Sequence, residues 1–246
     1  MIPKIIHYCW LSGDPYPDKI RFCVDSWRKH LPDYEIRLWD LQRFDLSSSL
    51  WCKEAFESRK YAFAADYIRW YALFNEGGIY LDSDVEVIKR FDDLLYLPYF
   101  IGFEQSGYLE PAIVGMEKGN TLCKQLLDYY EGRHFVKEDK SFDTIPLPQI
   151  MQMLLIPQYK FKAIYNVDEF ENAPKQINIF PASFFSPKRN DNFEVCLSEN
   201  TYSIHHFNAS WFPASKRMFR VVSRVFGYDF AVSLSSFLKR LQFQKQ

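Results

Sequence analysis

The sequence has no long hydrophobic run, no surplus of charge of either sign and no paired-cysteine motif. Because no 18 consecutive residues are apolar, we expect no segment that crosses a membrane. The first ten residues also lack the basic-then-apolar layout of a secretory signal. Five cysteines, an odd number without a Cys-x-x-Cys spacing, argue against a disulfide framework or a zinc site and favour a reducing cytoplasm.

A net charge of -1 gives the chain no general attraction to nucleic acid. Hydrophobic residues at 48% and charged residues at 25% are ordinary values for a soluble globular protein. The 246 residues suffice for one large α/β domain, and no internal repeat divides them. Composition therefore predicts a cytoplasmic globular protein without indicating what it does.

The most informative stretch is residues 61–87, which read YAFAADYIRWYALFNEGGIYLDSDVEV. Aromatic residues recur there every three or four positions, which predicts a helix that ends at Gly77. The apolar run at 79–81 predicts a short buried strand. Asp82 and Asp84 follow at the carboxyl end of this strand, which is where open α/β sheets bind their ligands.

Extended chain would turn the side chains of Asp82 and Asp84 to one face, where both could bind one cation. Oxygen ligands suit Mg²⁺ or Mn²⁺, which take further oxygens from substrate phosphates. Upstream, Asp66 and Arg69 are spaced to lie side by side on the predicted helix. An Asp-x-Asp pair alone is a weak signal, but its combination with the helix, two glycines and a strand is much more specific.

Residues 64–87 (AADYIRWYALFNEGGIYLDSDVEV) resemble the sugar-binding region of glycosyltransferase family 32. Two further stretches fit the same family, IPKIIHYCW at 2–10 and SIHHFNASW at 203–211, so the resemblance spans about residues 1–211. This family includes yeast-type initiating mannosyltransferases and bacterial capsule and lipopolysaccharide transferases, with the large clostridial glucosylating toxins as distant relatives. The resemblance is specific for the family and weak for the substrate.

The resemblance implies a GT-A-type α/β fold, Rossmann-like with a mixed central sheet, in a domain covering residues 1–213. It also implies that Trp10, at the carboxyl end of the first strand, lies against the base of a nucleotide sugar. Asp66 and Arg69 would hold the hydroxyl groups of the donor sugar. From its position alone, Trp10 fits a packing role in the hydrophobic core equally well.

The resemblance further implies a site for Mn²⁺ or Mg²⁺. A cation on Asp84, with Asp82 bonding the ribose or a metal-bound water, would neutralise the diphosphate of the donor. Neighbouring histidines on a strand point to opposite faces, so only one of them can reach this cation. From the family's late His-aromatic stretch we expect His206, in preference to His205, to complete the site. Two further residues are expected near the diphosphate: Ser210 and Trp211.

We therefore expect a hexosyltransferase that moves a sugar from a nucleotide diphosphate donor, with UDP-sugars favoured, to a glycan or lipid-linked acceptor in surface polysaccharide synthesis. The resemblance implies that the anomeric configuration is retained. Two other classes stay open. Haloacid-dehalogenase-like phosphatases also place Asp-x-Asp after an apolar strand, although Glu86 stands where their pattern has Thr or Val. A non-catalytic nucleotide-sugar-binding module would bind the donor without turnover.

Hydrophobic periodicity and turn residues predict the remaining elements. Residues 132–144 are polar and aperiodic and predict a loop, with a plain surface loop favoured over a mobile one that acts as a lid or contacts the acceptor. The expected strands cover 4–10, 34–40, 100–103, 112–116, 176–180 and 202–206, and the expected helices cover 18–31, 50–58, 120–130 and 148–155.

The last stretch, residues 214–246, predicts a basic amphipathic helical tail. Residues 216–246 hold seven Lys or Arg and one acidic residue, and apolar side chains recur at helical spacing. Such helices can lie on anionic membranes, whereas packing on the domain or on a second subunit is equally compatible with the pattern. A membrane-bound acceptor would place the protein at the inner face of the cell membrane.

We predict that the intact chain floats with anionic liposomes and is released by high salt, because the attraction is electrostatic. A chain that ends at Pro213 is the control and should not float. Equal indifference of both chains to anionic lipid would assign the tail to protein packing.

Overall fold

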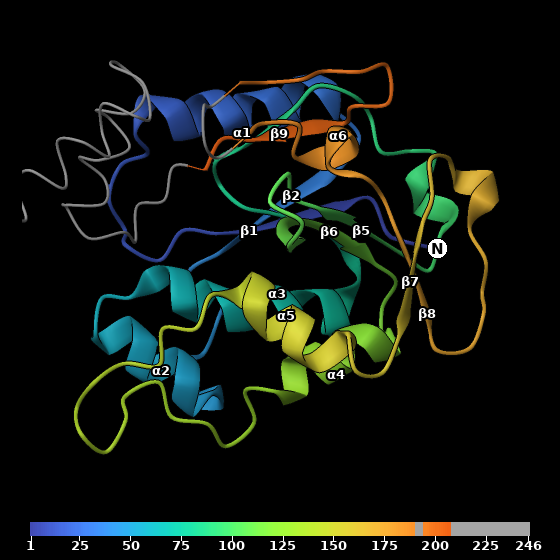
Figure 1. The fold of residues 1–246 in the computed structure, drawn as a ribbon. Coiled ribbons are helices and arrows are strands. Elements are labelled where there is room, and N and C mark those ends of the chain that lie inside the picture. Colours follow the sequence, from blue (N-terminus) through green and yellow to red (C-terminus); the bar gives the residue numbers. More distant parts are fainter. Residues whose placement is uncertain (190–193, 208–246) are drawn as a thin grey trace, which may run out of the picture.

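The computed structural model describes residues 1–189 and 194–207 (Figure 1). The predicted tail at 214–246 and the candidates Ser210 and Trp211 lie outside these residues. The elements follow in this order: β1 (Ile5–Cys9), α1 (Asp18–His30), β2 (Glu35–Trp39), η1 (Leu46–Ser48), α2 (Leu50–Glu57), α3 (Tyr61–Glu76), β3 (Gly78–Leu81), β4 (Val85–Val87), η2 (Leu94–Tyr96), β5 (Tyr99–Phe103), β6 (Leu109–Met116), α4 (Thr121–Asp128), α5 (Leu147–Leu155), β7 (Lys160–Ala163), η3 (Val167–Glu169), β8 (Gln176–Ile179), α6 (Ala182–Phe185) and β9 (Ser203–His205).

The central sheet has five strands in the order β2-β1-β3-β6-β5. Strands β2, β1 and β3 run parallel, and β6 and β5 join antiparallel to their neighbours. The parallel half is a βαβ unit followed by a third strand, and the antiparallel half makes the sheet mixed. This arrangement confirms the expected α/β fold with a mixed central sheet. It also aligns the carboxyl ends of β1, β2 and β3 along one edge.

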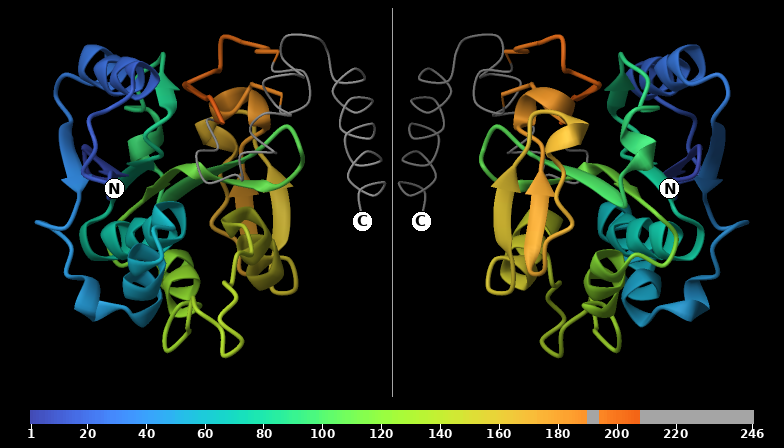
Figure 2. Two further views of the ribbon diagram at one scale, coloured as in Figure 1. Left: turned by 90° about the vertical axis from the view of Figure 1, so that its left-hand side faces the viewer. Right: turned by 90° about the vertical axis from the view of Figure 1, so that its right-hand side faces the viewer.

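Helices and short strands cover both faces of this sheet (Figure 1). Helices α2, α3, α4 and α5 cover one face and enclose one hydrophobic cluster. Helix α1, strand β9 and helix α6 cover the other face and enclose a second cluster. Strand β4 pairs antiparallel with β9 rather than with the central sheet, so residues 85–87 and 203–205 form a small ladder of their own. Strands β7 and β8 stand side by side beyond β5 (Figure 2).

The turn from α3 into β3 is built from two glycines with positive φ, Gly77 at 69° and Gly78 at 109°. His7, fully buried on β1, holds this turn from the neighbouring strand. Its Nδ1 accepts a hydrogen bond from the indole of Trp39 at 3.0 Å, so its Nε2 carries the proton and donates to the Gly77 carbonyl at 2.7 Å. Burial lowers the pKa of His7, which keeps the ring neutral. His7 is therefore a structural residue.

Three segments were not fully predicted from the sequence. Residues 132–144 form an irregular surface loop, as expected, but Phe135 within it is fully buried and packs on the rings of Trp51 and Phe63. A carboxylate oxygen of Glu54 on α2 also accepts the backbone N–H of Val136 at 2.9 Å. One aromatic anchor and one carboxylate thus fix a segment whose composition is polar. Sequence patterns also missed β7 and α6, which are four residues long each.

Within the part of the chain that the structure describes, no helix combines the length and the apolar character needed to cross a bilayer.

We predict that Gly78→Ala lowers the free energy of unfolding by about 2 kcal/mol or more, since it adds steric overlap to backbone strain. A Cβ at this position would stand 2.7 Å from the carbonyl oxygen of Ile5 and 3.0 Å from His7 Nε2. Urea unfolding followed by circular dichroism measures the change.

Gly132→Ala is the matched control, because Gly132 also has a positive φ but a Cβ there would meet nothing within 4 Å. Only the backbone term remains, so we expect a loss of about 1 kcal/mol. Equal losses in both variants would contradict the tight packing of the α3–β3 turn.

Candidate active site

The predicted helix residues Asp66 and Arg69 lie together on α3, and Arg69 connects them to the strand that follows. Its guanidinium is only 3% exposed. Its Nη2 donates to Asp82 Oδ1 at 2.8 Å and lies 3.5 Å from Asp66 Oδ1. Its Nη1 donates to the Pro111 carbonyl on β6 at 2.7 Å. The structure therefore brings Asp66 and Arg69 side by side, as the spacing predicts, and adds Asp82 to the same cluster.

Asp82 and Asp84 are also neighbours, but through a turn and not through extended chain. The Asp82 N–H donates to Ala112 on β6 at 2.9 Å, which continues the β3–β6 ladder by one residue. The Val85 N–H then donates back to the Asp82 carbonyl at 3.0 Å and closes a β-turn between β3 and β4. The expectation of extended chain at the acidic pair was wrong, because β4 leaves the central sheet to pair with β9, whereas residues 85–87 are extended as expected.

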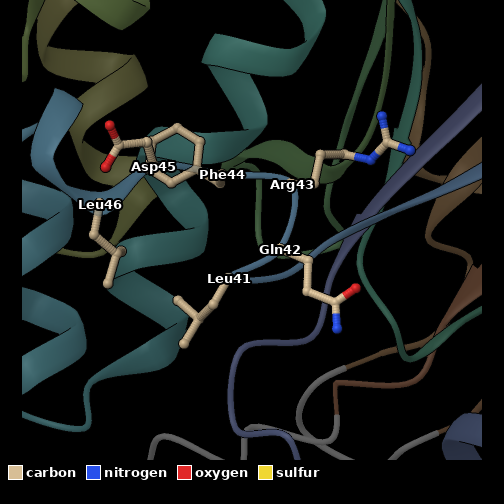
Figure 3. Close-up of a pocket in the computed structure, with 6 residues that line it drawn as sticks. All are labelled: Leu41, Gln42, Arg43, Phe44, Asp45 and Leu46. Atoms are coloured by element: carbon tan, nitrogen blue, oxygen red, sulfur yellow. The ribbon is translucent and has the colours of Figure 1, made fainter.

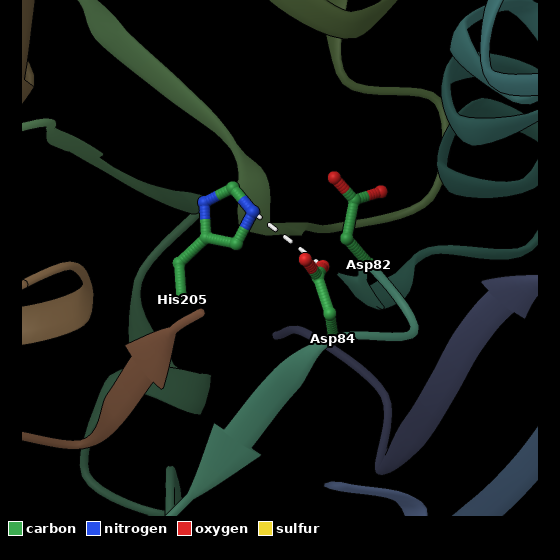
Figure 4. A group of neighbouring side chains, drawn as sticks. All are labelled: Asp82, Asp84 and His205. Carbon is green, nitrogen blue, oxygen red and sulfur yellow. Dashed lines mark ion pairs between the residues drawn. The ribbon is translucent and has the colours of Figure 1, made fainter. Parts of the chain in front are cut away.

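The histidine beside the carboxylates is His205 and not His206 (Figure 4). His205 Nε2 lies 3.5 Å from Asp84 Oδ1. His206 points to the other face of β9, where its Nε2 and a Glu86 carboxylate oxygen are 2.8 Å apart. The preference for His206 is thus corrected. The register of β9 on β4 sets opposite residues on one face, Val85 with His205 and Glu86 with Ile204, and so carries His206 to the Glu86 side.

One buried group of this site, Glu110 on β6, was not predicted from the sequence. Its carboxylate is fully buried and lies 3.1 Å from His205 Nδ1. It also accepts hydrogen bonds from the Ala112 N–H at 2.9 Å and from the Ser186 hydroxyl. No motif marks Glu110, and it is separated from His205 by 95 residues. A buried acidic residue in an otherwise apolar strand is the one signal that could have identified it.

Burial and charge shift the pKa values in this cluster in opposite directions. Burial raises the pKa of Asp66 to about 7, and Arg69 offsets this only in part. Burial likewise raises the pKa of Asp82. Burial favours the neutral ring of His205, but the Glu110 and Asp84 carboxylates outweigh it and raise its pKa. The acidic groups of this cluster thus favour the presence of a further positive charge beside them.

Asp82, Asp84 and His205 fit a divalent cation. Each can offer one ligand atom, and these three atoms lie within 4.8 Å of one another. Two carboxylate oxygens and one imidazole nitrogen suit Mn²⁺ or Mg²⁺, and three protein ligands leave coordination positions for diphosphate oxygens and water. The chemistry of the donor set therefore agrees with the metal that the motif predicts.

Trp10 follows β1 at the same edge of the sheet. Its indole N–H donates to the Asp14 carbonyl at 2.7 Å, and its ring meets the ring of Tyr16 edge-on with centroids 5.0 Å apart. The side chain is partly exposed rather than enclosed in the core. A ring fixed in this way at a strand end can offer a face to a nucleotide base.

An open depression of about 450 Å³ lies beyond the carboxyl end of β2 (Figure 3). Residues 41–46 line it, and none of the predicted site residues contributes to it. The candidate site therefore lies at the ends of β1 and β3, with His205 and Glu110 added from β9 and β6.

Residues 17–100 match the family described as "Glycosyltransferase sugar-binding region containing DXD motif". This span contains α1, α2, α3 and the Asp82–Asp84 turn. This part of the chain is thus similar to glycosyltransferase sugar-binding regions with a DXD motif, as the motifs predicted.

Among its relatives is inositol phosphoceramide mannosyltransferase 3 of Schizosaccharomyces pombe, 31% identical over 134 residues, which cover 51% of this chain and 36% of that protein. Subversion of eukaryotic traffic protein A of Legionella pneumophila is 29% identical over 175 residues, which cover 57% of this chain and 27% of that protein. The chain spans roughly a third or less of the length of these relatives. A solved structure titled PaToxG Glycosyltransferase aligns with a TM-score of 0.45 at 20% identity, over 63% of this chain and 70% of that one.

Proposed function

We propose that the protein is a metal-dependent glycosyltransferase that transfers a hexose from a nucleotide diphosphate sugar to a glycan or lipid-linked acceptor. One observation carries the proposal: Asp82, Asp84 and His205 meet within 4.8 Å, at the edge where β1 and β3 end and beside the buried Arg69. A nucleotide-sugar transferase needs these parts, a cation site for the diphosphate and fixed polar groups for the sugar.

Each residue has a separate role in this proposal. Asp84, Asp82 and His205 hold Mn²⁺ or Mg²⁺, which when bound supplies positive charge against the developing charge of the diphosphate leaving group. Arg69 fixes the Asp82 carboxylate through the 2.8 Å contact and stays rigid because it is buried. Asp66 binds a hydroxyl group of the sugar. Its pKa is raised by burial, which fits a carboxyl group that loses its contact with water when the donor binds.

The acceptor and the stereochemistry are further parts of the proposal. Relatives named as mannosyltransferases and as acting on inositol phosphoceramide support a hexose donor and a lipid-linked acceptor. Retention of configuration, a UDP-sugar donor and a role in surface polysaccharide synthesis at the inner face of the cell membrane complete the proposal from the family resemblance.

The phosphatase alternative loses support in this fold. Its acidic pair belongs after the first strand, whereas Asp82 and Asp84 follow β3, which is preceded by a βαβ unit and by α2 and α3. A non-catalytic binding module remains an outcome of the test. A panel of UDP-, GDP- and CMP-sugars with Mn²⁺, followed by donor hydrolysis without acceptor, separates it from a transferase. Donor binding without hydrolysis or transfer would overturn the proposal.

We predict that chelation abolishes donor hydrolysis and that Mn²⁺ or Mg²⁺ restores it. Asp84→Asn should lower the rate by about 10²-fold or more while the protein stays folded, because it removes preorganised charge. Glu86→Gln is the matched control, since this carboxylate is two residues away but contacts His206 on the other face of β9. Full activity in EDTA, or an equal loss in Glu86→Gln, would contradict the assignment.

We also predict that Trp10→Ala raises the KM for the donor, whereas Trp10→Phe keeps much of the binding, because stacking needs only an aromatic face. Thermal melts of both variants control for packing against Tyr16. An unchanged KM together with a lower melting temperature would show that Trp10 serves packing and does not bind the base.

A further inference from the structure

Glu110 contacts three separate segments from a position that water does not reach. It lies on β6, beside the strand that leads to Asp82, and it is 0% exposed. One carboxylate oxygen accepts the Ala112 N–H on its own strand, at 2.9 Å. The other oxygen contacts the Ser186 hydroxyl and, at 3.1 Å, Nδ1 of His205. Both oxygens of this carboxylate thus make polar contacts, and one of these contacts is with the candidate metal ligand His205.

The contact with Glu110 decides which nitrogen of His205 faces Asp82 and Asp84. An ionised carboxylate only accepts hydrogen bonds, so the ring nitrogen next to it must carry a proton. Nδ1 is therefore the protonated nitrogen of a neutral His205 ring. When a cation displaces the second proton of the ring, the free lone pair is that of Nε2, which lies 3.5 Å from Asp84 Oδ1 (Figure 4). A metal needs that nitrogen and that orientation.

We propose that Glu110 is a positioning residue for the metal centre, which it serves through His205 without touching the cation. This inference rests on the proposed function, because it assumes that Asp82, Asp84 and His205 bind a cation. Glu110 fixes the rotation of the imidazole and keeps Nε2 available as a ligand. Carboxylates that hold a ligating histidine in this way raise the basicity of the ring and increase metal affinity.

The neighbouring histidine supplies an internal comparison. His206 and Glu86 form a pair of the same chemistry, with Nε2 and the carboxylate oxygen 2.8 Å apart. This pair stands at the same end of β9 but on its other face, and neither member belongs to the group around Asp84. A general effect of losing a His–Glu contact at this strand end therefore appears when Glu86 is altered, and a loss of cation affinity that appears only when Glu110 is altered is specific to the His205 side of β9.

The contrasting interpretation is that Glu110 is a structural anchor. Its contact with Ser186 joins β6 to the segment after α6, and a buried carboxylate is costly unless it is fully hydrogen-bonded. An anchor would change the stability of the protein when altered, but it would leave the cation affinity of the folded protein unchanged. Cation affinity, measured directly, thus separates the two roles.

The experiment measures Mn²⁺ binding to the full chain by isothermal titration calorimetry, with circular dichroism as a check of folding. We expect Glu110→Gln, which keeps the size of the side chain and removes its charge, to weaken Mn²⁺ binding by about 10–100-fold. Glu86→Gln should bind Mn²⁺ as the wild type does. The double variant Glu110→Gln/His205→Ala should bind no more weakly than His205→Ala alone, because Glu110 acts through that ring.

Unchanged Mn²⁺ affinity in folded Glu110→Gln, or additive losses in the double variant, would overturn the positioning role and leave the proposed function intact. Absence of Mn²⁺ and Mg²⁺ binding in the wild type would overturn both. If Glu110→Gln does not fold, Glu110→Asp decides in its place. It keeps the charge but withdraws the oxygen from Nδ1 by one methylene, so weaker Mn²⁺ binding supports the role and unchanged binding refutes it.

Discussion

The buried guanidinium of Arg69 is the interaction on which the candidate site depends. It lies 4.4 Å above the ring of Tyr80 on β3 and bonds to the Asp82 carboxylate and the Pro111 carbonyl. A buried cation of this kind is stable only when its partners compensate its lost hydration. Helix α3, the end of β3 and strand β6 are therefore fixed relative to one another by one side chain. The carboxylates of the site inherit their positions from it.

Local sequence patterns predicted most of the elements for a physical reason. Helix α3 shows its period of aromatic residues within sixteen residues, its glycine stop comes directly after them, and β3 follows as an apolar run. The Asp82 and Asp84 pair and its neighbours on α3 could be found because the whole motif is contiguous in sequence. Interactions over such short distances are encoded by spacing alone.

Features that depend on strand register were not predictable in this way. The facing of His205 follows from the pairing of Val85 with His205, which joins residues far apart in sequence. The turn at Asp82 follows from the departure of β4 toward β9, and a single-residue shift of that pairing would exchange His205 for His206. Glu110 belongs to no motif at all, because its partners come from its own strand, from residue 186 and from residue 205.

The small β4–β9 ladder gives the site a property that the central sheet alone cannot provide. Asp82 and Asp84 directly precede β4, and His205 lies on β9. The three ligand atoms therefore meet only when β9 is paired with β4. A cation that binds all three stabilises the paired arrangement over any in which β9 has separated, by an amount set by its affinity. The His206 N–H donates to the Asp84 carbonyl at 3.1 Å and continues this pairing by one more bond. Glu110 holds His205 from the central sheet, so cation binding, β9 pairing and the β6 core act on the same imidazole.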